Sequence, residues 1–126
     1  MEVLNLAGTE DTPTIVLNAE EKVFSISGRS LPEDAASFYA PVLKWLSDFE
    51  SSQSGVNITF EVKLEYFNTA SSKLLLDIFS KLEDINSNDS NTVKLEWYYE
   101  TDDEDMMEAG EEYSELVELD FVLKPY

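Results

Sequence analysis

The amino-acid sequence predicts a small two-layer α/β domain in which a mixed five-stranded sheet packs against about three helices. Five segments alternate between apolar and polar residues with the period of two that a half-buried strand requires. Three further segments, set between the later strands, carry apolar residues at helical spacing. The predicted order is therefore β-β-α-β-α-β-α-β, and the 126 residues are expected to form a single domain spanning residues 1–126.

Each of the five predicted strands places one row of apolar side chains toward the core. These rows are Ile15 and Leu17; Phe24 and Ile26; Val56, Ile58, Phe60, Val62, Leu64 and Tyr66; Val93, Leu95, Trp97 and Tyr99; and Val117, Leu119, Phe121 and Leu123. The first two strands are close enough for an antiparallel hairpin, whereas helical crossovers favour parallel pairing of the later ones. Polar residues between the apolar ones predict that the helices cover mainly one side of the sheet.

The three predicted helices differ in how clearly they begin and end. The first starts at Ser30-Leu31-Pro32-Glu33, where Ser30 and Glu33 have capping-box spacing, and Pro41 inside its apolar run predicts a kink or a break. The third helix is short, about residues 103–116, and Gly110 is expected to weaken it. The second helix carries Leu74, Ile78, Leu82 and Ile85 on one stripe.

The charge of the chain narrows the range of partners. Acidic residues outnumber basic ones by 27 to 8, and the formal net charge is −19. Such a surface repels phosphate backbones and anionic membranes, so nucleic-acid binding is not expected. No hydrophobic leader opens the chain and its apolar runs are too short to span a bilayer, so we expect a cytoplasmic protein without membrane insertion.

Few residues are available for catalysis. The absence of cysteine and histidine excludes thiolate chemistry, disulfides, a zinc ribbon and serine-histidine hydrolysis. The four glycines, at positions 8, 28, 55 and 110, form no phosphate-binding loop. A small carboxylate enzyme remains an alternative, but pairs of acids arise by chance among 27. We therefore expect a non-enzymatic protein without a cofactor.

An acidic run, Asp102, Asp103, Glu104 and Asp105, follows the predicted strand that ends at Tyr99. Carboxylate oxygens are the ligands that Ca²⁺ and Mg²⁺ prefer, yet the run lacks the spaced ligands, central glycine and distant glutamate of an EF-hand loop. The favoured interpretation is an acidic first turn of the third helix, where negative charge is stabilised. No metal site is predicted, and the run is a candidate acidic partner surface.

The corner from Asn68 to Ser72 is unusually rich in residues that cap helices. Asn68, Thr69 and Ser71 each suit the N-cap position, which needs only one of them. With Ser72 and Lys73, they follow the carboxyl end of a long strand, where open α/β sheets place binding sites. A helix start also tolerates an added phosphate. Two interpretations remain open on these grounds: a regulated phosphorylation site at Thr69, or a simple cap.

The string Tyr66-Phe67-Asn68-Thr69-Ala70-Ser71-Ser72-Lys73 closely resembles the signature of the SiaC family of bacterial regulatory phosphoproteins. The resemblance extends from about Thr9 to Phe121, and its motifs occur in order. These further motifs are Thr12-Pro13; Gly28-Arg29-Ser30 with Pro32-Glu33; Phe38-Tyr39 with Pro41 and Trp45-Leu46; Trp97 and Tyr99 leading to Asp102–Asp105; and Gly110 to Glu112. Ala70 departs from the pattern, which more often has serine there, but the phosphoacceptor is intact.

The resemblance implies a fold similar to STAS domains, the fold of anti-sigma-factor antagonists, and a partner-switching role. It implies that a cognate Ser/Thr protein kinase with a histidine-kinase-like ATPase fold phosphorylates Thr69. It also implies that a PP2C-like phosphatase removes the phosphate. The unphosphorylated form is then expected to bind and activate a diguanylate cyclase, which raises cyclic di-GMP and favours aggregation or biofilm growth.

We expect Thr69 to lie on an exposed partner surface formed by the second helix and the corner, with Asn68, Ser71, Ser72 and Lys73 around it. Parallel pairing would open the acidic run at the same edge of the sheet. Two alternatives are a regulator of the anti-sigma-factor-antagonist type and a constitutive acidic adaptor or scaffold in which the corner is only a cap.

Overall fold

The computed structural model describes all 126 residues, and its single sheet contains six strands in the order β1-β2-β3-β4-β5-β6. The strands pair antiparallel from β1 to β3 and parallel from β3 to β6. The elements are β1 (Leu4–Leu6), β2 (Thr14–Asn18), β3 (Val23–Ser30), α1 (Ala35–Ser52), β4 (Asn57–Phe67), α2 (Thr69–Asn86), β5 (Thr92–Tyr99), α3 (Glu104–Leu116) and β6 (Asp120–Pro125).

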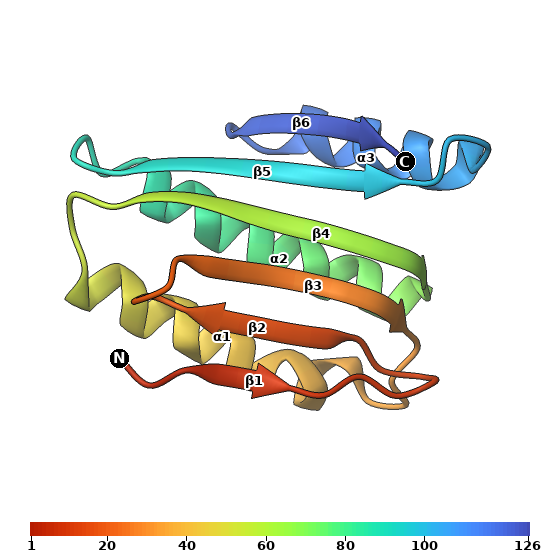
Figure 1. The fold of residues 1–126 in the computed structure, drawn as a ribbon, viewed down its shortest axis with the longest axis horizontal. Helices are drawn as coiled ribbons and strands as arrows, with labels where there is room; N and C mark the ends of the chain where they lie inside the picture. Colours follow the sequence, from red (N-terminus) through yellow and green to blue (C-terminus); the bar gives the residue numbers. More distant parts are fainter.

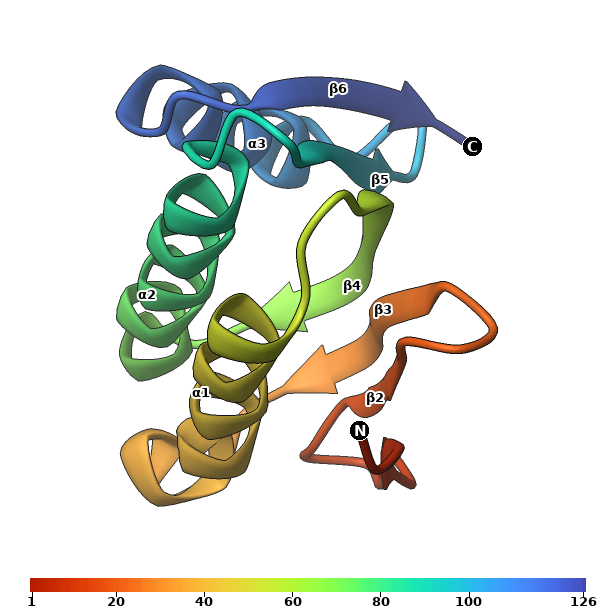
Figure 2. The ribbon, with the colours of Figure 1, turned by 90° about the vertical axis from the view of Figure 1, so that its left-hand side faces the viewer.

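All three helices lie behind one face of the sheet, which leaves the other face open (Figure 1). Seen along the strands, α1 and α2 lie side by side behind the sheet, with α2 reaching β5, and α3 lies behind β5 and β6 (Figure 2). This two-layer α/β arrangement, with its antiparallel hairpin and parallel crossovers, confirms the fold class predicted from the sequence. The parallel strands bring the carboxyl ends of β3, β4 and β5 to one edge of the sheet.

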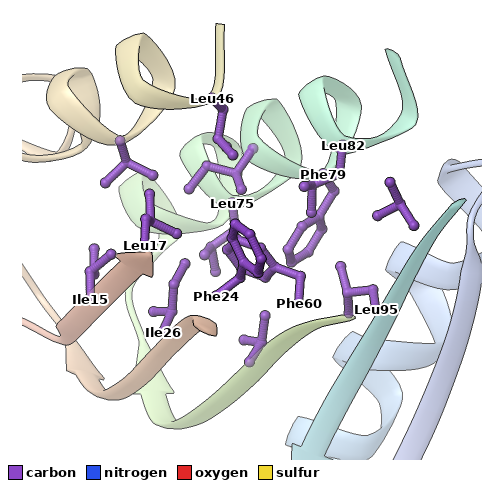
Figure 3. Packing of buried hydrophobic residues seen from close by; sticks show 14 of the residues in the cluster. Ile15, Leu17, Phe24, Ile26, Leu46, Phe60, Leu75, Phe79, Leu82 and Leu95 are labelled. Carbon is purple, nitrogen blue, oxygen red and sulfur yellow. The ribbon is translucent and has the colours of Figure 1, made fainter. Parts of the chain in front are cut away.

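The core lies between the sheet and the helices, because the strand alternation sends one apolar row inward. Figure 3 shows Leu17, Ile26 and Phe60 from three neighbouring strands pointing toward Leu46 of α1 and toward Leu75 and Phe79 of α2. All six are 0% exposed. Full burial of such side chains stabilises the fold by about 1.5–3 kcal/mol each.

The open face of the sheet carries the polar residues of the alternation. Glu96 lies on this face on β5 and forms ion pairs with Lys94 and Lys124. The hydrogen bond from Lys124 holds the pKa of the Glu96 carboxyl below its usual range, and the two ammonium groups act in the same direction. The charge of Glu96 is therefore neutralised within this face.

Three details of the sequence prediction were wrong. A sixth strand, β1, was missed because its three residues form a half-buried edge strand that pairs only with β2. The first helix begins after Asp34, whose Oδ1 accepts a hydrogen bond from Ser37 N (3.1 Å), and not at Ser30. The predicted break at Pro41 does not occur: the helix continues through it, with Tyr39 and Val42 on either side buried in the core.

The ends of the later strands also differ from the prediction. Val117 is the C-cap of α3, so the last strand begins only at Asp120. The register between β3 and β4 shifts after Gly28: Gly28 pairs with Leu64, but Arg29 pairs with Tyr66, which leaves Glu65 as an extra residue on β4. The φ of Gly28, +102°, is one that other residues rarely adopt. The shift turns Tyr66, which was predicted to be buried, outward to 49% exposure.

The same shift turns the next residue, Phe67, toward the helices. Its ring lies 6.1 Å from that of Trp97 on β5 and 6.4 Å from that of Tyr113 on α3. Phe67 is therefore the last residue of β4 to contact the helical layer, directly before the corner at Asn68.

Gly110 allows α3 to approach β5 closely. A Cβ atom at this position would lie 2.5 Å from Trp97 Cδ1 and 2.7 Å from its Nε1. The indole Nε1 also donates a hydrogen bond to Met106 O in α3 (3.0 Å). The glycine that weakens the isolated helix therefore sets the distance between α3 and the sheet.

We predict that Gly110→Ala destabilises the protein, although alanine favours helices. The gain in helix propensity is about 1 kcal/mol, whereas overpacking a buried contact costs about 1–3 kcal/mol. The free energy of unfolding in urea should therefore fall by up to about 2 kcal/mol. Glu111→Ala, at an exposed neighbouring position, is the control and should change it by less than about 0.5 kcal/mol. A stabilised Gly110→Ala would contradict the packing argument.

Candidate functional site

The corner between β4 and α2 is held by Asn68. Its side-chain Oδ1 accepts a hydrogen bond from Ser71 N (2.8 Å), and its backbone N–H donates to Ser30 O at the end of β3 (3.0 Å). Asn68 is thus the N-cap, and the first helical residue is Thr69. Of the three N-cap candidates, Asn68 caps the helix, and the hydroxyls of Thr69 and Ser71 are not needed for this cap.

Ser71 is a buried structural residue. Its hydroxyl donates to Ser30 O (3.1 Å) and accepts from Ser30 Oγ (2.8 Å), which in turn bonds to Tyr39 OH (2.6 Å). Ser30, Ser71 and Tyr39 are all 0% exposed, and burial raises the pKa of the Tyr39 phenol. This chain of hydroxyls fastens β3, α1 and the start of α2 together. Ser30 serves this network, and that explains why it does not cap α1.

Ser72 joins α2 to α3. Its hydroxyl donates to Thr69 O (2.7 Å), and its backbone carbonyl accepts from Tyr113 OH in α3 (2.7 Å). Burial raises the pKa of the Tyr113 phenol, so this donor stays protonated at neutral pH. Ser72 is therefore half-buried in the corner, and its hydroxyl is already engaged in a hydrogen bond.

Among the hydroxyl residues of the corner, Thr69 is the one whose side chain holds no other part of the fold in place. Its side chain is exposed, and its hydroxyl makes no hydrogen bond within the chain. No acidic residue stands in the first turn of α2, while Lys73 lies one turn further on, exposed and without an ion pair. With no base bonded to it, this hydroxyl has the chemistry of an ordinary alcohol open to solvent.

The acidic run lies at the same edge of the sheet as the corner, but only part of it faces the corner. Asp103 is the N-cap of α3 and accepts a hydrogen bond from Met106 N (3.0 Å). Asp103 and Asp105 line a hollow of about 260 Å³ together with Tyr66 and Phe67. Asp102 and Glu104 are exposed and do not line it.

A second hollow, of about 370 Å³, lies between α2 and α3. Its lining includes Ser72, Lys73 and Leu76 from α2 and Glu112, Tyr113 and Leu116 from α3. Phe67 and Ala109 line both hollows, so the two are neighbours. Sequence reasoning missed these hollows because Leu76 and Leu116 give no signal that separates them from core positions of the same helices.

Two other features, a metal-binding group and a membrane-spanning helix, are absent from the structure. No group of three or more carboxylates is arranged to hold a metal ion. None of the helices combines the length and the apolar character that a bilayer-spanning segment needs.

Comparisons with known proteins agree with this geometry. The family model described as SiaC family regulatory phosphoprotein matches residues 6–126. An uncharacterized protein from Pseudomonas aeruginosa strain UCBPP-PA14 is 28% identical over 126 residues, which cover 100% of this chain and 98% of that protein.

Solved structures from P. aeruginosa resemble the whole fold. SiaC superposes with a TM-score of 0.90 at 27% identity over 100% of both chains. Apo-SiaC gives 0.88 at 28% identity, covering 98% of this chain and 99% of that one. The crystal structure of the diguanylate cyclase SiaD in complex with its activator SiaC gives 0.90 at 28% identity, with the same coverage.

We predict that the hydroxyls of the corner differ sharply in their effect on stability. Ser71→Ala leaves the Ser30 hydroxyl proton unpaired in the interior, so the free energy of unfolding should fall by about 1–3 kcal/mol. Thr69→Ala removes no hydrogen bond and should change it by less than about 0.5 kcal/mol. Urea unfolding of both variants measures this, and equal losses would show that Thr69 has a structural role after all.

Proposed function

The chain belongs to the SiaC family of regulatory phosphoproteins, and we propose that it is a non-enzymatic signalling protein whose partner binding is switched by phosphorylation of Thr69. The observation that carries the proposal is the state of the Thr69 hydroxyl, which is exposed and unbonded while its neighbours hold the fold. A protein kinase needs an extended or exposed hydroxyl, and Thr69 supplies one without loss of any internal bond.

Phosphorylation and its reversal are the work of two other proteins. A cognate Ser/Thr kinase with a histidine-kinase-like ATPase fold transfers the γ-phosphoryl group of ATP to Thr69 Oγ1, with release of ADP and the hydroxyl proton. A PP2C-like phosphatase hydrolyses the phosphoester and restores the alcohol. ATP is the phosphoryl donor, so the switch operates in the cytoplasm.

The output partner is a diguanylate cyclase. SiaC of P. aeruginosa is the activator of the diguanylate cyclase SiaD, with which it was crystallised, and its fold superposes on this chain at a TM-score of 0.90. By this likeness, the unphosphorylated form of this chain binds and activates a cyclase, raising cyclic di-GMP and favouring aggregation or biofilm growth. The surface around Asn68, Ser72 and Lys73 forms part of the contact, with the hydroxyl of Thr69 exposed upon it, whereas Ser71, which was expected on this surface, is buried beneath it.

The added phosphate acts on the complex more than on the fold. It brings about −1.5 to −2 charges and three acceptor oxygens. In the free protein these remain in water, beside Lys73 and the positive end of the α2 dipole. In a complex, the phosphate must be desolvated against a partner surface that fits a neutral threonine. This desolvation of the charge weakens the complex by several kcal/mol.

We predict that Thr69→Asp weakens binding of the cyclase at least a hundredfold with little change in melting temperature. Thr69→Ala should bind like the unphosphorylated wild type and should stay bound in the presence of kinase and ATP. Each diguanylate cyclase of the source genome is purified and titrated with the three proteins by calorimetry. Equal affinity of all three for the cyclase would rule out the switch and leave a constitutive acidic adaptor.

We also predict a single phosphoacceptor. Incubation of wild type with the histidine-kinase-like Ser/Thr kinases of the same genome and ATP should add one phosphate, located at Thr69 by mass spectrometry. The PP2C-like phosphatases should then remove it. Ser72→Ala, which removes a neighbouring hydroxyl, is the matched control and should still be phosphorylated, whereas Thr69→Ala should not. Phosphate at another residue would move the switch elsewhere.

A further inference from the structure

The open face of the sheet, which faces the viewer in Figure 1, is neutral although the chain is strongly acidic. Its outward positions carry four basic and four acidic residues, namely Arg29, Lys63, Lys94 and Lys124, and Glu61, Glu65, Glu96 and Asp120. The net charge of −19 therefore lies on the helices, turns and termini. A second molecule of the same charge is repelled by the helical side of this protein but not by its open face.

Short side chains cover the part of this face that β2 and β3 form. They are Thr14, Val16 and Asn18 on β2 and Val23, Ser25 and Ser27 on β3. None of them is charged, so no ion has to be desolvated when this part of the face is covered. Sheets that stack face to face lie about 10 Å apart, and short side chains permit that approach.

Two opposite charges on β4, those of Glu61 and Lys63, have no ion pair within the protein. Glu61 pairs in the sheet with Glu96, whose charge is already neutralised by other lysines. The ammonium of Lys63 lies 4.4 Å from the centroid of the Tyr126 ring and has no counter-ion. Both residues are exposed, so each charge is open to a group from outside the protein.

Five strands share one row of paired residues, which crosses β4 at Val62, between Glu61 and Lys63. The row consists of Ile15, Ile26, Val62, Trp97 and Leu123. A two-fold axis parallel to this row, just outside the open face, places Glu61 of one copy opposite Lys63 of a second copy, and the reverse. It also places Ser25 opposite Ser27, since these lie on either side of the row. The face is therefore complementary to itself, as a symmetric dimer requires.

We infer that two copies of this chain associate through their open faces, with Glu61 and Lys63 pairing reciprocally across a two-fold axis. The strands of the two sheets then run in opposite directions, and the acidic helices lie on the two outer sides. Complementary charges fix the register of such a contact. The inference does not depend on the proposed function, because α2, which begins at Thr69, lies behind the opposite face of the sheet (Figure 2).

The size of the open face predicts a weak dimer. Six strands span about 24 Å and an eight-residue strand about 26 Å, so about 1,200 Å² is covered over both copies, the lower end for a specific interface. The two helical layers lie about 30 Å apart, well beyond the Debye length of about 8 Å, so their mutual repulsion is screened. We therefore expect a dissociation constant on the order of 10 µM or weaker.

Reversal of single charges tests the pairing. Lys63→Glu and Glu61→Lys each place like charges opposite one another at two points of the dimer, so each should weaken it about tenfold or more in sedimentation equilibrium. The double variant with both substitutions restores opposite charges at both points and keeps the wild-type net charge. It should dimerise like wild type. Because both positions are exposed, all three variants should keep the wild-type melting temperature.

Lys44→Glu is the matched control. It changes the net charge by the same amount as Lys63→Glu, but it lies on the exposed side of α1. It should dimerise like wild type. Equal weakening by Lys44→Glu and Lys63→Glu would show a general repulsion between acidic molecules and would overturn the pairing.

The remaining outcomes are as sharp. Acetylation of the concentrated wild-type protein, read by mass spectrometry, should spare Lys63 and modify Lys44, and equal modification would overturn the open-face contact. A wild type that stays monomeric up to about 500 µM would overturn the dimer itself. So would a double variant that fails to restore the dimer overturn the reciprocal pairing. Thr69→Asp should dimerise like wild type, and none of these results alters the test of the phosphorylation switch by cyclase titration.

Discussion

The hydrogen bonds between Ser71 and Ser30 fix the start of α2 against the end of β3, and the surface of the corner follows from them. An α-helix turns by about 100° per residue, so Thr69, two positions before Ser71, points about 200° away. Burial of Ser71 therefore forces Thr69 outward. The same rotation places Ser72, Lys73 and Leu76 on the side of Thr69, toward α3, where they line the hollow between α2 and α3. One buried hydroxyl thus orients Thr69 toward solvent and turns the face of α2 that carries Ser72, Lys73 and Leu76 toward α3.

Sequence patterns predicted the sheet wherever a residue's direction depends on its own strand. The row from Ile58 to Leu64 points inward as expected, because alternation is a local property. The prediction was wrong at Tyr66, because the pairing with β3 shifts between Gly28 and Arg29 and leaves Glu65 as an extra residue on β4, which turns Tyr66 outward. It was wrong at Ser30 for a similar reason, since the hydroxyl that suits an N-cap bonds to a residue 41 positions away. Long-range pairing overrode the local signals in both places.

The corner of the site was predictable, but the hollows beside it were not. Cap-forming residues between a strand and a helix marked the segment from Asn68 to Ser72, although spacing alone did not show which hydroxyl stays free. That distinction comes from burial, which leaves Ser71 inside and Thr69 outside. The hollows depend further on how closely α3 approaches the sheet, which Gly110 sets against Trp97. A glycine that the helical pattern marks only as unfavourable is, in three dimensions, a condition for the site.

In the proposed switch, the buried residue that holds the corner, Ser71, differs from the residue that is modified, Thr69, and reversibility requires this. A modification shifts an equilibrium only as far as it interacts differently with the two states. A phosphate on Ser71 would oppose folding itself, because its charge would enter the core. On Thr69 the charge stays in water in the free protein and meets its desolvation cost only when a partner covers it. Under the proposed function, the fold can therefore be phosphorylated and dephosphorylated repeatedly without unfolding, while only the complex with the partner is affected.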